Sequence, residues 1–376
     1  MLSLKLPLAL LTLTMVLPSC CTCTVSGSSS GTMKKEILNS YLFKAADRFY
    51  PNADEISSVD KFPKLNDKQV KEIEQEMASF LKIIQNLHSK EYDHINNIFA
   101  GQVRPKASAT IRITSRNVPI CQVASDNKTI ELDVKIAQAL FRGALLDYID
   151  NTDHFFRDDF LKVSDIKKDD PDREQKIIKT LMKKKAEIEQ ASTHTIVGDM
   201  ADMVSSDRFD ESSWSKLAGV SLSSMSLMNR YQGSALFMIA HEYGHIVLHH
   251  RERLRKAREE RPKEEHTDMS ECQLRVRMEL EADAYAVVLL TKLAGPIRME
   301  IGGIDKITGY ENFFRYVYHL GGFPEEEDRQ HGCSYPDLNE RLRQAESIEE
   351  AIWQKNEDAM WEAINKQFDE QLKKMH

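Results

Sequence analysis

A single pentapeptide, His241-Glu242-Tyr243-Gly244-His245, constrains this chain more than any other part of its sequence. Residues four apart lie on one face of a helix, so His241 and His245 can bind the same metal ion. Apolar residues flank the pentapeptide on both sides, which predicts that it lies within a buried helix. Glu242 follows the first histidine, where its carboxylate can reach a metal-bound water. The alternative is a chance match on an ordinary core helix, because this motif alone is a moderate signal.

A second stretch, Met278 to Ala286, places acidic side chains among leucine and alanine. Unpaired charges are costly to bury, so these acids suggest a metal site, which needs a third protein ligand. Glu279 and Asp283 share a helix face, whereas Glu281 is about 200° from each of them on a helix of 3.6 residues per turn. We therefore expect Glu279 to bind the metal and Asp283 to orient a ligating histidine, with Glu281 outside the site.

Two histidines, one carboxylate and an open position suit hydrolysis. Zinc polarises a carbonyl and lowers the pKa of its bound water towards about 7. The sequence therefore predicts one Zn²⁺ ion and a zinc-dependent metalloendopeptidase that cleaves a protein or peptide substrate with a water activated by Glu242. A peptidase-like zinc-binding sensor or scaffold without turnover is the alternative. The presence of Glu242 argues against it, since a binding module needs no base.

The two motifs together resemble those of the gluzincin zinc metallopeptidases, His-Glu-x-x-His followed by Glu-x-x-x-Asp. The form at 279–283, Glu-Leu-Glu-Ala-Asp, is most similar to the family that contains the CAAX prenyl protease and the heat-shock protease HtpX. The short interval between His245 and Glu279 is closer to that of compact ImmA/IrrE-type peptidases, so both branches stay open. Either resemblance implies a zincin-like metallopeptidase domain.

A later stretch, Ser334-Tyr335-Pro336 with Glu340-Arg341-Leu342, is similar to the Ser-His-Pro and Glu-Arg-Leu motif of the prenyl protease family. Tyr335 stands where that family has histidine, so the group that stabilises the oxyanion stays open. Tyr335 and His331 are both candidates, because each can donate a hydrogen bond to an oxyanion. A structural role for either residue is the competing interpretation.

Histidines continue beyond the pentapeptide at His249 and His250. His249 falls in line with the two ligand candidates but lies a turn further on, so we expect it at the surface or behind the ligands. The helix is expected to extend through residues 251–255 and to end before Pro262.

Charge and cysteine content limit the remaining functions. The net charge of −8, with charged residues of both signs making up 29% of the chain, argues against nucleic acid as the main partner.

Three of the six cysteines, Cys20, Cys21 and Cys23, crowd the N-terminus. The others are odd in number and widely spaced, which predicts no disulfide framework.

The N-terminus has the pattern of an export signal. Lys5 precedes an apolar run from Leu6 to Leu17, which is shorter than the roughly 20 residues of a membrane-spanning helix. The sequence then resembles a bacterial lipobox, with Cys20 as the candidate lipidation site. This favours an exported protein, periplasmic or attached to the membrane through a lipid anchor. Translation from Met33 is the alternative and would give a cytoplasmic peptidase that cleaves a regulator.

The remaining pattern predicts an α+β fold that is mostly helical. Strand candidates at 109–114, 119–124 and 129–132 are followed by a helix capped by Asp133, which predicts a small antiparallel sheet beside the active-site helix. The expected organisation is a signal peptide at 1–24, a linker at 25–60, an N-terminal helical region at 61–108, a zinc metallopeptidase domain at 109–346 and a C-terminal helix at 347–376.

Overall fold

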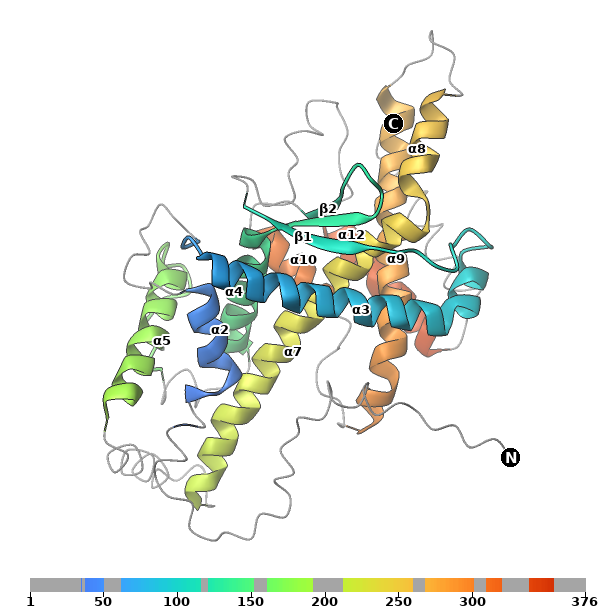
Figure 1. The fold of residues 1–376 in the computed structure, drawn as a ribbon. Helices are drawn as coiled ribbons and strands as arrows, with labels where there is room; N and C mark the ends of the chain where they lie inside the picture. The colour runs from blue at the N-terminus through green and yellow to red at the C-terminus, as the bar shows by residue number, and fades with distance from the viewer. Residues whose placement is uncertain are drawn as a thin grey trace.

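The computed structural model describes residues 35, 38–50, 62–115, 121–151, 161–191, 212–259, 268–300, 309–319 and 338–354. This part of the chain has the mostly helical α+β fold that the sequence predicts, with helices around one small sheet (Figure 1). The candidate signal peptide, together with Cys20, His331 and Tyr335, lies outside the described residues.

Helix α7 (Ser212–Val247) is the element on which much of the fold packs. Helices α3 (Asp67–Ile98), α4 (Val134–Asn151), α9 (Asp268–Glu300) and α10 (Tyr310–His319) all contact it, and α3 crosses it in Figure 1. From Ser234 to Leu248 most side chains are buried, so this half of the helix is enclosed on nearly every side. The pentapeptide therefore lies in the core.

Helix α3 shows how the local sequence sets the start of an element. The Asn66 side chain accepts a hydrogen bond from the Gln69 amide, and the Gln69 side chain accepts one from the Asn66 amide, each at 3.0 Å. This capping box satisfies donors that the first helical turn leaves unpaired. The apolar stripe of α3 is buried in the core that it shares with α7 and α9: Ile73, Met77, Phe80, Leu81, Ile84 and Leu87.

Helix α2 (Tyr41–Phe49) lies within the segment that the sequence predicts to be a linker. Leu42, Ala46 and Phe49 recur at helical spacing on one face, and all three are buried. Phe49 stacks on Phe141 of α4 with ring centroids 4.9 Å apart. The linker prediction is therefore wrong for these residues, because their apolar face packs into the core.

The sheet is mixed rather than antiparallel. Its order is β1 (Thr110–Thr114), β3 (Thr129–Asp133), β2 (Cys121–Val123). The predicted hairpin of β2 and β3 is antiparallel, but β1 pairs with β3 in parallel. The antiparallel prediction is therefore wrong for β1, which joins the sheet on the side of β3 away from β2 and runs in the same direction as β3. The Asp126 carboxylate shapes the tight β2–β3 turn, since it accepts hydrogen bonds from the backbone amides of Lys128 and Thr129, each at 2.8 Å.

Helix α4 follows β3 directly, as expected. The Asp133 carboxylate accepts a hydrogen bond from the Lys135 amide at 2.8 Å and so caps the helix. Helix α5 (Arg173–Gln190) is charged but buries Ile177, Ile178 and Leu181, so it packs through one face and leaves the other to solvent.

The metal-site helix ends earlier than the sequence predicts. Helix α7 stops at Val247 and a separate helix, α8 (His250–Glu259), begins after a residue with positive φ, His249 at +60°. The Arg104 amide donates to the Val247 carbonyl at 2.9 Å, which satisfies an acceptor at the helix end. The extended helix predicted through 251–255 is therefore wrong, because the chain turns at His249.

Helix α9 instead runs longer than expected, through Gly295 and Pro296 to Glu300. Proline removes a single backbone hydrogen bond, and the earlier turns of α9 are held by packing on α7. Helix α12 (Leu338–Trp353) packs against α9 and α10.

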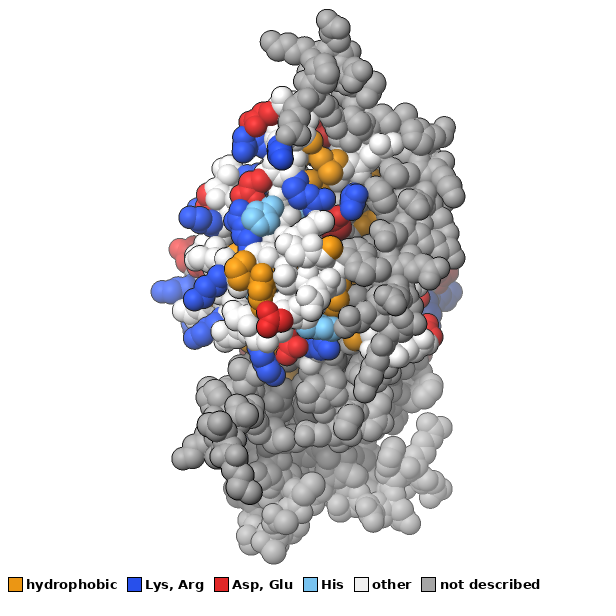
Figure 2. Space-filling view, turned by 90° about the vertical axis from the view of Figure 1, so that its right-hand side faces the viewer, with side chains coloured by type: hydrophobic (Ala, Val, Ile, Leu, Met, Phe, Trp, Pro, Cys, Tyr) orange, Lys and Arg blue, Asp and Glu red, His pale blue; other side chains and the backbone are white. Residues whose placement is uncertain are grey.

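None of the helices in the described part of the chain is both long enough and apolar enough to cross a membrane. On the face shown in Figure 2, Lys and Arg side chains are interspersed with Asp and Glu, and hydrophobic side chains form small groups between them. Such mixed charge is the pattern of a solvated surface.

Candidate metal centre

The site forms where α7 and α9 approach each other closely at Gly244. A Cβ atom at this glycine would lie 3.0 Å from Cδ1 of Tyr285 and 3.4 Å from Cα of Ala282. Ala282 and Ala286 are fully buried and add little bulk between the two helices. This close approach brings Glu279 on α9 within reach of the histidines on α7.

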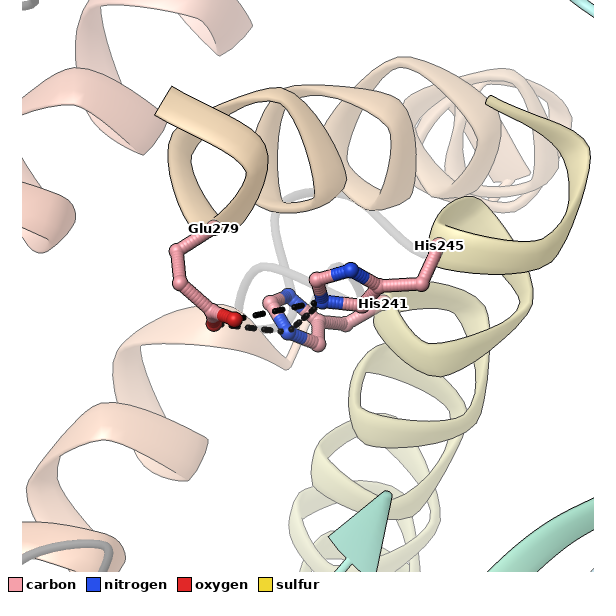
Figure 3. A group of neighbouring side chains, drawn as sticks. All are labelled: His241, His245 and Glu279. Carbon is pink, nitrogen blue, oxygen red and sulfur yellow. Dashed lines mark hydrogen bonds and ion pairs between the residues drawn. The ribbon is translucent and has the colours of Figure 1, made fainter. Parts of the chain in front are cut away.

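His241, His245 and Glu279 point toward one another (Figure 3). The two Nε2 atoms are 3.1 Å apart, and the Glu279 carboxylate oxygens lie 3.3 Å from Nε2 of His241 and 3.4 Å from Nε2 of His245. One ligand atom from each residue forms a triangle whose sides are all within 4.8 Å, so these residues could hold a metal ion.

One side of the triangle is accessible. The His245 and Glu279 side chains retain 16% and 17% of their exposure, whereas the His241 side chain retains 8%. A fourth position could therefore admit water or a substrate group, as catalytic zinc sites require.

Asp283 contacts His241 on the side away from Glu279. Its Oδ1 atom lies 2.8 Å from Nδ1 of His241, and Arg341 of α12 donates two hydrogen bonds to the same carboxylate, at 2.6 and 2.8 Å. With the Nδ1 proton donated to Asp283, Nε2 is the atom of His241 that could bind a metal once it has lost its own proton. The sequence pointed to Arg341 only through the late Glu-Arg-Leu motif.

His245 has a different partner. Its Nδ1 atom lies 2.8 Å from Nδ1 of His250, and Nε2 of His250 lies 3.2 Å from Oε2 of Glu281. Glu281 contacts His250 and Arg253 of α8 and not the two candidate metal histidines, so it lies on another face of α9 than Glu279. Sequence reasoning missed the role of His250, because a fifth residue along a continuous helix would not face His245.

Glu242 is buried beside the triangle and is 6% exposed. Burial raises its pKa to about 8, and the negative charge of Glu279 adds to the rise while His241 opposes it. The Cys121 thiol of strand β2 hydrogen-bonds with the Glu242 carboxyl. A cysteine count could not have linked these residues, since they are far apart in the sequence and meet only through the packing of β2 on α7.

The ionisable groups of the site shift one another's pKa values. Burial opposes ionisation of Glu279, but the two histidines and Arg341 outweigh it and lower its pKa. Burial also disfavours a proton on His241, yet hydrogen bonds with Asp283 and Glu279 outweigh it and raise its pKa to about 10. Burial lowers the pKa of His245. The metal-free site therefore holds a proton on His241, in a position where a cation could replace it.

His249 does not take part in the triangle. Its ring contacts Arg104 at 3.0 Å and Glu252 at 2.9 Å, and its side chain is 35% exposed, in agreement with the expected place at the surface.

The cysteine prediction needs correction. Cys272 near the start of α9 is disulfide-bonded, whereas Cys121 is a free thiol. An odd number of widely spaced cysteines therefore concealed at least one disulfide, because pairing depends on distance in the fold and not on spacing in the sequence.

Comparisons of the chain with protein-family models, with curated proteins and with solved structures find no match.

Proposed function

We propose that this chain is a zinc-dependent metalloendopeptidase with a zincin-like fold. The observation that carries the proposal is the triangle of His241, His245 and Glu279, in which one ligand atom from each residue lies within 4.8 Å of the other two. Two imidazoles with one carboxylate favour zinc over magnesium or calcium, which prefer oxygen ligands. The accessible side of the triangle supports a catalytic rather than a closed structural site.

Zinc bound there would supply Lewis acidity and a water acidified towards neutral pH. Glu242 would accept the proton of the attacking water and return it to the leaving amine. The pKa of about 8 that burial gives Glu242 applies to the metal-free protein. A nearby cation would lower this pKa and so favour the carboxylate that a general base requires.

The substrate would be an extended peptide. Strand β2 is an edge strand of the described sheet and packs on α7 beside the pentapeptide. Its residue Cys121 contacts Glu242, so a peptide paired with β2 would pass close to the general base. Main-chain hydrogen bonds to an edge strand bind many sequences, which suits an endopeptidase.

We further propose that the protein is exported, with Cys20 as the attachment site for a lipid anchor. The disulfide at Cys272 supports this location, because disulfides persist mainly in oxidising compartments.

The decisive test is Glu242→Gln, with Glu259→Gln on the exposed part of α8 as the matched control. Zinc content is measured by metal analysis, and turnover by cleavage of casein and by mapping new N-termini in a proteome. We expect Glu242→Gln to keep about one zinc per chain and to lose turnover by about 100-fold or more, because the amide cannot accept the proton. The control should match the wild type.

Two outcomes would contradict the proposal. Turnover of Glu242→Gln within a few-fold of the wild type would exclude Glu242 as the general base. A wild-type protein that binds zinc but cleaves none of these substrates would favour the zinc-binding sensor or scaffold.

A further inference from the structure

The second metal histidine, His245, is held by a residue outside the metallopeptidase motifs. Its Nδ1 atom faces Nδ1 of His250 at 2.8 Å, and the two rings are T-shaped with centroids 4.8 Å apart. His250 is only 3% exposed. A buried ring nitrogen at this distance from another needs a proton between them, so one ring donates and the other accepts.

The remaining contacts decide which ring donates. Glu281 lies 3.2 Å from Nε2 of His250, and a carboxylate can only accept. His250 therefore carries its proton on Nε2 and presents a lone pair at Nδ1. His245 must then carry its own proton on Nδ1, which leaves its Nε2 lone pair directed at Glu279 and the metal position.

Glu281 is itself held in place from two helices. Arg253 of α8 forms hydrogen bonds with both of its oxygens, and Arg277, one turn earlier on α9, donates to Oε1 at 2.7 Å. The Glu281 side chain is 12% exposed. Its carboxylate is therefore ionised and fixed in orientation, as an acceptor for His250 must be.

The backbone is shaped to make this contact. In a continuous helix, His250 would lie about 140° around the axis from His245 and could not face it. The chain instead leaves α7 after Val247 and adopts a left-handed conformation at His249, with φ of +60°. Residues other than glycine adopt this conformation at a cost, and such strain often accompanies a functional site. Here the turn brings His250 onto the ring of His245.

We propose that His250, oriented by Glu281, is a positioning residue that holds His245 in the tautomer and ring orientation required for metal binding. This inference deepens the proposed function, on which its zinc-binding consequence rests. The two metal histidines then have equivalent support from one helix, since α9 supplies Asp283 for His241 and Glu281 for the His245–His250 pair. Helix α9 thus supplies one metal ligand, Glu279, and two acids that orient the ligating histidines, Asp283 and Glu281.

The first experiment reads the tautomer without any metal. In metal-free protein, nitrogen-15 NMR of the histidine rings should show His245 neutral with its proton on Nδ1. In His250→Phe, which keeps a ring but removes both hydrogen bonds, His245 should shift toward the Nε2-protonated form. An Nε2-protonated His245 in the wild type would overturn the proposal, whatever the protein does with zinc.

The second experiment measures zinc affinity by competition with a chromophoric chelator. His250→Phe should bind zinc about 10–100-fold more weakly than the wild type. His250→Gln should recover part of this loss, because an amide offers an acceptor oxygen and a donor nitrogen at a spacing similar to that of imidazole. His249→Asn is the matched control, since asparagine tolerates positive φ and His249 contacts no metal ligand. It should bind zinc like the wild type.

Folding is monitored by thermal melting in the presence of chelator. If His250→Phe does not fold, Glu281→Gln replaces it, and this weaker, neutral acceptor should lower zinc affinity several-fold. A role in packing alone would lower the melting temperature but leave the zinc Kd and the His245 tautomer unchanged, and that result would overturn the proposal. If NMR shows the expected His245 tautomer but the protein cleaves no peptide, the result supports this proposal and contradicts the proposed function.

Discussion

Arg341 of α12 and Asp283 of α9 form a buried pair joined by two hydrogen bonds, of 2.6 and 2.8 Å. Both residues are at most 2% exposed, and the same carboxylate accepts the Nδ1 proton of His241. The guanidinium also lies 5.1 Å from the ring centre of Phe314. Helix α12 is thereby tied to the candidate metal centre through Arg341, which also lies 3.7 Å from the Glu279 carboxylate.

Removal of Arg341 should therefore destabilise the fold. Arg341→Leu leaves the Asp283 carboxylate buried without its cation, and breaking a buried pair in this way costs about 3–5 kcal/mol. Chemical denaturation of the metal-free protein measures the change. Arg343→Leu is the control on the same helix, because Arg343 is exposed and its side chain donates a hydrogen bond to the Asn339 carbonyl one turn earlier. Equal stability of the two variants would contradict the expected role.

Alanine substitutions of the three acids of α9 should affect zinc binding to different extents. Glu279→Ala should abolish zinc binding, because it removes a ligand. Asp283→Ala should weaken binding by about 10–100-fold, because it frees the ring of His241. Glu281→Ala should keep metal near one per chain at saturating zinc. The opposite order, with Glu281 essential and Glu279 dispensable, would contradict the geometry of the triangle.

Gly244→Ala should disturb the packing of α7 on α9. The added methyl group would meet Cδ1 of Tyr285 at 3.0 Å and the backbone of Ala282 at 3.4 Å, so the buried Tyr285 ring must move by a few tenths of an ångström. Overpacking of this kind costs about 1–3 kcal/mol, which exceeds the roughly 1 kcal/mol that alanine gains over glycine in a helix. Thermal melting and zinc affinity should therefore both fall. An increase in melting temperature with unchanged zinc affinity would show that the contact is not tight.

Zinc binding should release a proton and strengthen as pH rises. The raised pKa of His241, about 10, means that the ring is protonated at neutral pH in the metal-free protein. Zinc must displace that proton, so affinity increases with pH up to the region of this pKa and then levels off. Calorimetry at pH 8 in buffers of different ionisation enthalpy should give at least one proton released per zinc, since Glu242, with a pKa of about 8, can add a fraction of a second proton. A heat of binding independent of the buffer would contradict the protonated state.

Several features of the site could be predicted from the sequence, because they depend on the geometry of a single helix. A spacing of four residues places His241 and His245 together, and the same rule pairs Glu279 with Asp283 and excludes Glu281. The capping aspartate at residue 133 and the tight turn before β3 are also local, since their hydrogen bonds join neighbours in the chain.

The features that sequence reasoning missed depend on contacts between distant segments. Apolar spacing at residues 41–49 is compatible with a short helix, but only the core formed with α4 makes that helix stable. The parallel pairing of β1 with β3 likewise depends on which strand occupies the middle of the sheet. Such choices are made by burial of side chains from many elements at once, which a local pattern does not contain.

The sequence by itself determined that two histidines and a glutamate have the right type and spacing to bind a metal. Only the tertiary structure decided which side chains orient them. Arg341 reaches Asp283 because α12 packs on α9, and His250 reaches His245 because the backbone reverses at His249. The physical reason is that helix periodicity acts over a few residues, whereas the hydrogen bonds that orient a buried ligand join helices whose positions are set by the whole core.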